Sequence, residues 1–258
     1  MRKRKLLMLI GLELCFLALL GLLLVKYPAV FSPETSESAP QTCLPPPTES
    51  GLPETMPETK PQESTLPAPT ETAAPVPQDM DFVLVKDYIP DVVIDLAYAT
   101  ENNFTKTVIY DFSDCYLRYG TVKKLMQVQE KLKESGFRLK IWDGFRPIAA
   151  QEKLWQVCPD PTYVANPATG ASSHCKGNTV DITLVYSDGS EVKMPTGFDD
   201  FSTLADRDYS DCPEEARKNA EFLEELMEAM GFKPYFGEWW HFSDTTDYPV
   251  EKEFLKIQ

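Results

Sequence analysis

The spacing of hydrophobic residues in the second half of the chain changes repeatedly between helical and strand periods. Residues 121–136 predict an amphipathic helix, because apolar residues recur at helical spacing and Gly136 is a typical helix end. Residues 137–142 alternate apolar and basic side chains, which predicts a strand. The Gly and Pro residues of the following segment, 143–147, predict that this strand ends in a turn.

The rest of this region predicts two more helices and two more strands. Residues 148–157 have the pattern of a short helix, and residues 213–230 that of the longest helix, with acidic residues early. Strands are predicted at residues 178–186 and at the aromatic-rich residues 235–243. Helices and strands mix without regular βαβ alternation, so we expect an α+β fold with a largely antiparallel central sheet flanked by helices.

The first residues of the chain predict a membrane anchor. Residues 2–5 are all basic, and residues 6–25 form an apolar run of twenty residues broken only by Glu13. Such a run is long enough as a helix to cross the roughly 30 Å hydrocarbon core of a bilayer. We therefore expect residues 1–26 to make a single-pass anchor in the cell membrane. The basic cluster would lie in the cytoplasm and the rest of the chain outside.

A cleaved signal peptide is the alternative interpretation of residues 1–26. Its apolar region usually has only about 7 to 15 residues and precedes a small-residue cleavage site. The run in this chain is longer, and the segment 26–30 is not a clean cleavage site. Cleavage would make the protein secreted rather than anchored.

Residues 27–80 have the composition of a linker. The segment 28–80 holds 13 of the 22 prolines, together with many Thr and Glu residues and few large apolar ones. Such a chain buries too little apolar surface to offset its conformational entropy, so we expect a disordered stalk. This leaves residues 81–258 as the folded domain, a length sufficient for a single core.

Charge and cysteine content narrow the possible classes of protein. The formal net charge of −15 argues against nucleic acid as a partner, because phosphates require a basic surface. The six cysteines form no Cys-x-x-Cys pair, which excludes zinc knuckles and thioredoxin-like sites. Four cysteines fall in the predicted domain and could form two disulfides or remain buried thiols: Cys115, Cys158, Cys175 and Cys212.

The chain has only two histidines, and both lie in segments typical of metal ligands. His174 belongs to the segment 172–181, Ser-Ser-His-Cys-Lys-Gly-Asn-Thr-Val-Asp, which ends at Asp181. His241 ends the segment Gly-Glu-Trp-Trp-His. A catalytic zinc takes three protein ligands and leaves one position for water. His174, Asp181 and His241 therefore predict one Zn²⁺ per domain and a zinc hydrolase.

Two further residues have the chemistry that such a hydrolase requires. Glu238, three residues before His241, is suited to act as general base toward the attacking water. Arg146, on the turn after a predicted strand, could donate to the oxyanion, or it could pair with Asp143 for structure. In an ideal strand Glu238 and His241 point to opposite faces. We therefore expect that this segment bends or that Glu238 precedes the strand, and that His174 lies in a turn ahead of its own strand.

Together these segments resemble the VanX-like D-alanyl-D-alanine dipeptidases, zinc enzymes related to the VanY-type D,D-carboxypeptidases. The segments that match include 98–105, 143–147, 172–174 and 238–241. The resemblance implies a hedgehog/D,D-peptidase-like fold with a single zinc site. It assigns the zinc ligands, the base and the transition-state donor to the residues just described. It also implies that Asp199 pairs with the substrate ammonium and that Tyr98 and Ser172 contact substrate.

The resemblance favours hydrolysis of the D-Ala-D-Ala dipeptide in cell-wall peptide metabolism. Two alternatives remain. One is a wall-trimming D,D-carboxypeptidase or endopeptidase that acts on peptidoglycan stem peptides, which the predicted extracellular location favours. The other is a non-catalytic, zinc-containing wall-binding module, against which the presence of Glu238 argues.

Overall fold

The structure is a computed structural model, and it describes residues 76–254. Within this range no helix is both long and apolar enough to cross a bilayer. The predicted anchor, residues 1–26, and nearly all of the predicted linker, residues 27–80, lie outside the described residues. The predicted domain is described almost in full.

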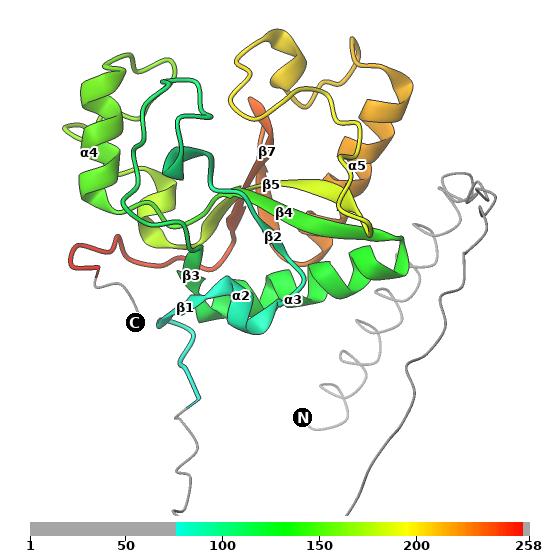
Figure 1. The fold of residues 1–258 in the computed structure, drawn as a ribbon, viewed down its shortest axis with the longest axis horizontal. Coiled ribbons are helices and arrows are strands. Elements are labelled where there is room, and N and C mark those ends of the chain that lie inside the picture. The colour runs from blue at the N-terminus through cyan, green and yellow to red at the C-terminus, as the bar shows by residue number, and fades with distance from the viewer. Residues whose placement is uncertain (1–75, 255–258) are drawn as a thin grey trace, which may run out of the picture. The chain divides into compact units, whose positions relative to one another are not determined.

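A five-stranded sheet forms the centre of the fold (Figure 1). Its order is β2 (Val93–Ile94), β4 (Phe137–Asp143), β5 (Thr179–Tyr186), β7 (Glu238–Asp244) and β6 (Phe232–Tyr235). The β2 strand runs parallel to β4, and all other pairs are antiparallel. A separate two-stranded sheet pairs β1 (Phe82–Leu84) with β3 (Tyr116–Arg118). The mixed α+β class and the largely antiparallel sheet are therefore confirmed.

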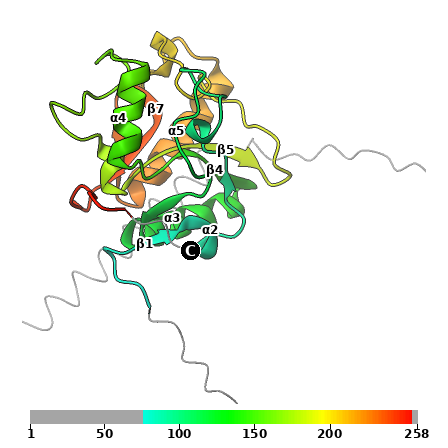
Figure 2. The ribbon, with the colours of Figure 1, turned by 60° about the vertical axis from the view of Figure 1, so that its left-hand side comes forward.

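The helices surround this sheet (Figures 1 and 2). They are α2 (Val85–Tyr88), α3 (Tyr119–Glu134), α4 (Ile148–Val157) and α5 (Glu214–Ala229), with the 3₁₀ turns η1 (Ala97–Ala99), η2 (Ser173–Lys176) and η3 (Thr203–Ala205). The prediction for α4 is confirmed at both ends, and α3 begins two residues before the predicted start at 121. Gly136, at φ 78°, follows the end of α3.

The strand pattern shows where the core lies. Along β4 buried and half-buried residues alternate, as in a strand with one face toward the core. In β5, the middle strand, every residue except Tyr186 is buried. The helix α3 packs along β4, and α5 packs against β6 and β7. The rigid centre of the sheet therefore carries the start of β5, where the candidate site lies.

The prediction of one strand over residues 235–243 is wrong. The chain turns at Phe236 and Gly237, so Tyr235 ends β6 and Glu238 begins β7. The continuous run of aromatic residues hid this hairpin, because periodicity alone marks no turn within it. The predicted strand 178–186 is confirmed as β5, which begins one residue later than predicted and ends at the predicted residue.

Arg118 joins the two ends of the described chain. Its guanidinium donates to the carbonyl oxygens of Met80 at 2.6 Å, Lys176 at 3.0 Å and Pro249 at 3.3 Å. The first described residues and the C-terminal segment accordingly both lie beside β1 and β3 (Figures 1 and 2). Within the described range all cysteines are free thiols, with Cys115 and Cys175 buried and Cys158 and Cys212 half-buried.

Candidate metal centre

Two of the predicted ligands lie directly opposite each other on neighbouring strands. Asp181, near the start of β5, is the cross-strand partner of His241 on β7. Directly opposed residues of an antiparallel pair project from the same face of a sheet. The Nδ1 atom of His241 accordingly lies 2.9 Å from Oδ1 of Asp181.

The third predicted ligand, His174, lies in η2, ahead of β5, as the sequence predicted. Its Nδ1 lies 2.8 Å from the carbonyl oxygen of Gly144. A carbonyl only accepts hydrogen bonds, so this contact places the proton on Nδ1 and leaves the Nε2 lone pair free. That Nε2 atom faces Asp181, 3.3 Å from its Oδ2.

The donor atoms of these three residues fit a metal ion. One atom from each of His174, Asp181 and His241 lies within 4.8 Å of the others. Two imidazole nitrogens and one carboxylate oxygen are a ligand set that zinc accepts, with one position left open. Burial opposes ionisation of Asp181, yet the two imidazoles hold its pKa below the usual range. The carboxylate is therefore ready to bind a cation.

A bulge in β7 brings Glu238 to the same side as His241. The β6 strand pairs Pro234 with Phe242 and Tyr235 with Glu238, so one residue step along β6 corresponds to four along β7. Bulges of this kind bend a strand and re-aim its side chains. As a result Oε2 of Glu238 lies 3.5 Å from Nδ1 of His241. Of the two alternatives anticipated from the sequence, the bend is present, whereas Glu238 is the first residue of the strand and does not precede it.

Glu238 has the electrostatic surroundings of a proton acceptor. Burial and the nearby Asp181 carboxylate raise the pKa of Glu238 above its usual value. A raised pKa brings a carboxylate closer to the value that suits a general base at neutral pH. Among the described residues, its only ion-pair partner is the imidazole of His241.

Arg146 lies next to the proposed metal ligands in a hydrogen-bonded network that uses three of its five guanidinium N–H donors. Its guanidinium donates to Asp143 at 2.5 Å, Gln151 at 2.9 Å and Tyr110 at 3.4 Å. Its backbone N–H donates to the carbonyl oxygen of His174 at 3.2 Å. Burial opposes the charge, but the Asp143 carboxylate raises the pKa of Arg146, which therefore stays protonated. The pairing with Asp143 that the sequence left open is present.

Asp199 and Tyr98, far apart in sequence, meet beside this network. The hydroxyl of Tyr98 donates to Oδ2 of Asp199 at 2.7 Å, and the Tyr98 ring centroid lies 5.0 Å from Cζ of Arg146. Asp199 has the left-handed φ of 52°, which Asp tolerates better than most residues. Burial, together with the Asp181 and Glu238 charges, raises the pKa of Asp199 to about 8.

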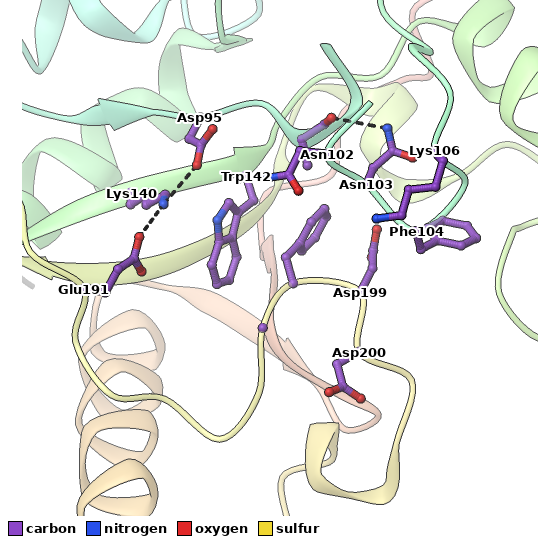
Figure 3. A pocket seen from close by; sticks show the side chains of 13 residues that line it. Asp95, Asn102, Asn103, Phe104, Lys106, Lys140, Trp142, Glu191, Asp199 and Asp200 are labelled. Atoms are coloured by element: carbon purple, nitrogen blue, oxygen red, sulfur yellow. Dashed lines mark hydrogen bonds and ion pairs between the residues drawn. The ribbon is translucent and has the colours of Figure 1, made fainter. Parts of the chain in front are cut away.

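A cavity of about 520 Å³ opens beside Asp199. Figure 3 shows Asp199 across from the segment that carries Asn102, Asn103 and Lys106, with Trp142 further along the cavity. The cavity offers both aromatic walls and polar groups to a ligand that contacts Asp199.

The remaining predicted residue, Ser172, caps η2. Its hydroxyl accepts from the backbone N–H of His174 at 3.4 Å, a contact that supports the loop of a ligand. The supporting residues Tyr110 and Gln151 were missed from the sequence. Tyr110 lies 36 residues from Arg146 in the chain, so no local pattern signals its contact, and Gln151, five residues after Arg146, belongs to no motif that marks it.

A buried histidine ahead of a strand, with an aspartate, a half-buried histidine and a glutamate on neighbouring strands, is the arrangement of a metallopeptidase centre. Comparison with known proteins agrees. Residues 78–258 match the family model of M15 peptidases described as D-ala-D-ala dipeptidase. The chain belongs to this family.

Three curated relatives share this description. The D-alanyl-D-alanine dipeptidase of Escherichia coli is 35% identical over 163 residues, which are 62% of this chain and 84% of that protein. The Streptomyces coelicolor protein of the same name is 30% identical over 191 residues, covering 63% and 91%. The Enterococcus faecalis protein of that name is 27% identical over 185 residues, covering 62% and 90%.

Proposed function

We propose that this chain is a zinc-dependent D-alanyl-D-alanine dipeptidase of cell-wall peptide metabolism. The observation that carries the proposal is the convergence of His174, Asp181 and His241, with Glu238 beside them, in a chain of this peptidase family. The dipeptidase name of the relatives supports the substrate class.

The ligand set defines how the centre would work. His174, through Nε2, His241, through Nδ1, and a carboxylate oxygen of Asp181 would hold Zn²⁺. When bound, zinc supplies Lewis acidity, which activates water for attack near neutral pH. Glu238 accepts the proton of the attacking water and then returns it to the leaving amine, for which its raised pKa suits it.

Arg146 and Asp199 hold the two charged features of the substrate. The Arg146 guanidinium, kept protonated by Asp143, donates to the carbonyl oxygen as negative charge develops on it. Asp199 faces the free ammonium of the dipeptide, and the ammonium supplies the positive charge that favours ionisation of its buried carboxyl group. The hydroxyl of Tyr98 fixes the orientation of Asp199.

The ammonium contact distinguishes a dipeptidase from a carboxypeptidase that acts on stem peptides. The full chain should hydrolyse D-Ala-D-Ala much faster than N-acetyl-D-Ala-D-Ala or a stem pentapeptide, since neither presents an ammonium next to the scissile bond. Equal rates on the three substrates, with release of the C-terminal alanine from each, would establish a carboxypeptidase instead.

Asp199→Asn tests the same contact from the protein side. Loss of one partner of a desolvated charge pair costs about 2 to 5 kcal/mol, so kcat/KM for D-Ala-D-Ala should fall by at least about thirtyfold. The matched control is Asp200→Asn, which removes an exposed carboxylate from the same cavity and should change kcat/KM less than twofold. Equal losses in both variants would contradict the role of Asp199.

We propose the location of the enzyme from the sequence alone. The apolar run 6–25 and the basic cluster 2–5 favour an anchor with the domain outside the cell, joined by the linker 27–80. Protease added to intact protoplasts should then release an active soluble fragment. Protection of the domain until lysis would contradict this topology.

A further inference from the structure

We infer that Arg207 is a positioning residue that holds the bulge of β7 in the shape required for metal binding and catalysis. The inference rests on the proposed metal centre and extends it. Arg207 follows η3, on the segment between β5 and α5, and its side chain is only 4% exposed.

The contacts of Arg207 span the hairpin between β6 and β7. Its Nε donates to the carbonyl oxygen of Tyr235 at 2.8 Å, and its Nη2 donates to that of His241 at 3.0 Å. Its backbone N–H donates to the carbonyl oxygen of Phe236 at 2.9 Å. One residue thus fixes both the end of β6 and the backbone of a proposed ligand on β7.

These contacts lie where regular strand pairing is interrupted. Between the pairs Pro234–Phe242 and Tyr235–Glu238, the β6–β7 register gives Trp239, Trp240 and His241 no partner in β6. Buried carbonyl groups require hydrogen-bond donors, and the Arg207 guanidinium supplies one to His241. The arginine therefore takes the place of the missing strand contacts at the point where Glu238 and His241 are aimed together.

The hairpin tip has little other support. Tyr235 is 57% exposed and Phe236 is 66% exposed, so apolar packing holds the tip only weakly. Arg207 itself is held by contacts with α5 and with β7. Its Nη1 lies 2.9 Å from Oε2 of Glu224 on α5, and its guanidinium carbon lies 4.4 Å from the centroid of the Phe242 ring.

Lysine cannot reproduce this arrangement. The planar fork of arginine presents several donors in fixed directions, whereas lysine has a single ammonium on a flexible stem. In Arg207→Lys the charge and the contact with Glu224 can be kept, but the carbonyl oxygens of Tyr235 and His241 cannot both retain their donors. The bulge should then relax, and the separation of Glu238 from His241 should vary.

The consequence should appear in metal affinity as well as in turnover. Residues that orient a ligand typically contribute about 10- to 100-fold to metal affinity or activity. For the full chain with Arg207→Lys we expect the Kd for Zn²⁺ to rise about tenfold or more. At saturating Zn²⁺, kcat for D-Ala-D-Ala should fall about tenfold or more while KM changes less than threefold, because the contacts of Asp199 are untouched.

In the experiment, metal is removed from the full chain, which is then titrated with Zn²⁺ in competition with a chromophoric chelator. Urea unfolding and kinetics are measured in parallel. The matched control is Arg138→Lys on β4, whose half-buried guanidinium donates to the carbonyl oxygen of Asp91 at 3.4 Å, at the opposite end of the strand from Asp143. This control should keep the wild-type Kd and kcat within twofold, even where it lowers the free energy of unfolding.

If Arg207 had a structural role alone, Arg207→Lys would lower the free energy of unfolding but leave the Zn²⁺ Kd and kcat as in the wild type. That result would overturn the inference. Should Arg207→Lys not fold, Glu224→Gln takes its place, and a Zn²⁺ Kd within twofold of wild type would then overturn it. The affinity is measured without substrate. A wild type that binds Zn²⁺ but leaves D-Ala-D-Ala intact would therefore refute the proposed function and not this inference.

Discussion

Acidic side chains lie at both ends of β7, but the negative charge is balanced differently at each end. At the C-terminal end, Asp244 accepts hydrogen bonds from Thr121 at 2.9 Å and from the backbone of Thr246 at 2.7 Å, and it pairs with Lys124. This carboxylate has its full set of partners within the protein. Such a group stabilises the fold and has no capacity left for a ligand.

At the N-terminal end of β7 the charge is not balanced in this way. Among the described residues, the ion pairs of Asp181 and Glu238 are with imidazoles alone, and those imidazoles are neutral when they act as metal ligands. Like charges so close together are unfavourable without a cation. The comparison shows that one strand can carry a carboxylate whose partners all lie within the protein and, at its other end, a site whose negative charge requires a bound cation.

Removal of a proposed metal ligand should have the largest effect on Zn²⁺ binding and hydrolysis. It tests the N-terminal end of β7 directly. His174→Ala and His241→Ala should each lose Zn²⁺ binding and with it all measurable hydrolysis, because two ligands cannot hold the ion as three do. Metal analysis of the purified full-length variants checks this. Stoichiometric zinc in both variants would show that the ligands lie elsewhere.

Glu238→Gln should separate catalysis from metal binding at this same end. A general base contributes about 10² to 10⁴ in rate, so kcat should fall by that range while Zn²⁺ remains bound. Glu221→Gln, on α5, is the matched control, because it removes a partly exposed carboxylate and should leave kcat unchanged. A loss below tenfold in Glu238→Gln would assign the base to another residue.

At the C-terminal end of β7, Asp244→Ala should destabilise the fold and leave Zn²⁺ binding unchanged. The change leaves the Thr121 hydroxyl and the backbone N–H of Thr246 without their acceptor, so the free energy of unfolding should fall by about 2 to 4 kcal/mol. Urea unfolding measures this change, and chelator competition measures Zn²⁺ affinity. A weakened Zn²⁺ affinity in the folded variant would show that the two ends are coupled.

A further expected effect is a pH dependence of the free energy of unfolding due to Asp199. In the metal-free protein its pKa is about 8, whereas an unfolded Asp titrates near about 3.9. Between these values the folded state binds more protons than the unfolded state, so the contribution of Asp199 to stability falls as pH rises from about 4 to about 8. The Asn side chain of Asp199→Asn does not ionise, so this variant does not lose stability as pH rises in this way. It should be more stable than the wild type at pH 8.

Thermal unfolding of metal-free wild type and Asp199→Asn across this pH range checks the sign. The difference should shrink toward pH 4, where the wild-type carboxyl group is protonated when folded and about half protonated when unfolded. A difference that does not depend on pH would contradict the raised pKa.

The convergence of the proposed metal ligands was predictable, because their chemistry is carried by residue identity. With two histidines in the whole chain, the set His174, Asp181 and His241 could be proposed without knowing how the strands pair. The placement of His174 before β5 also followed, since strand geometry excluded the alternative. The Asp199 and Tyr98 pair was reached only through resemblance, because 101 residues separate the two.

The irregular parts of the fold were not predictable in this way. The hairpin at Phe236 and Gly237 lies within an aromatic run whose pattern continues through the turn. Arg207 contacts carbonyl groups 28 and 34 residues further along the chain, and a single arginine in a loop carries no periodic signal. Propensity and spacing describe local preferences, whereas a bulge and its support depend on tertiary contacts.

The links made by Arg118 also define how the domain bears a mechanical load. Tension on the chain ahead of residue 78 reaches Met80, whose carbonyl oxygen is bonded to Arg118, and then β1, which pairs with β3. The C-terminal segment is bonded to the same guanidinium at Pro249. Force entering at one end of the domain is thus shared with the other end at this junction and, through the carbonyl oxygen of Lys176, with η2, which carries His174.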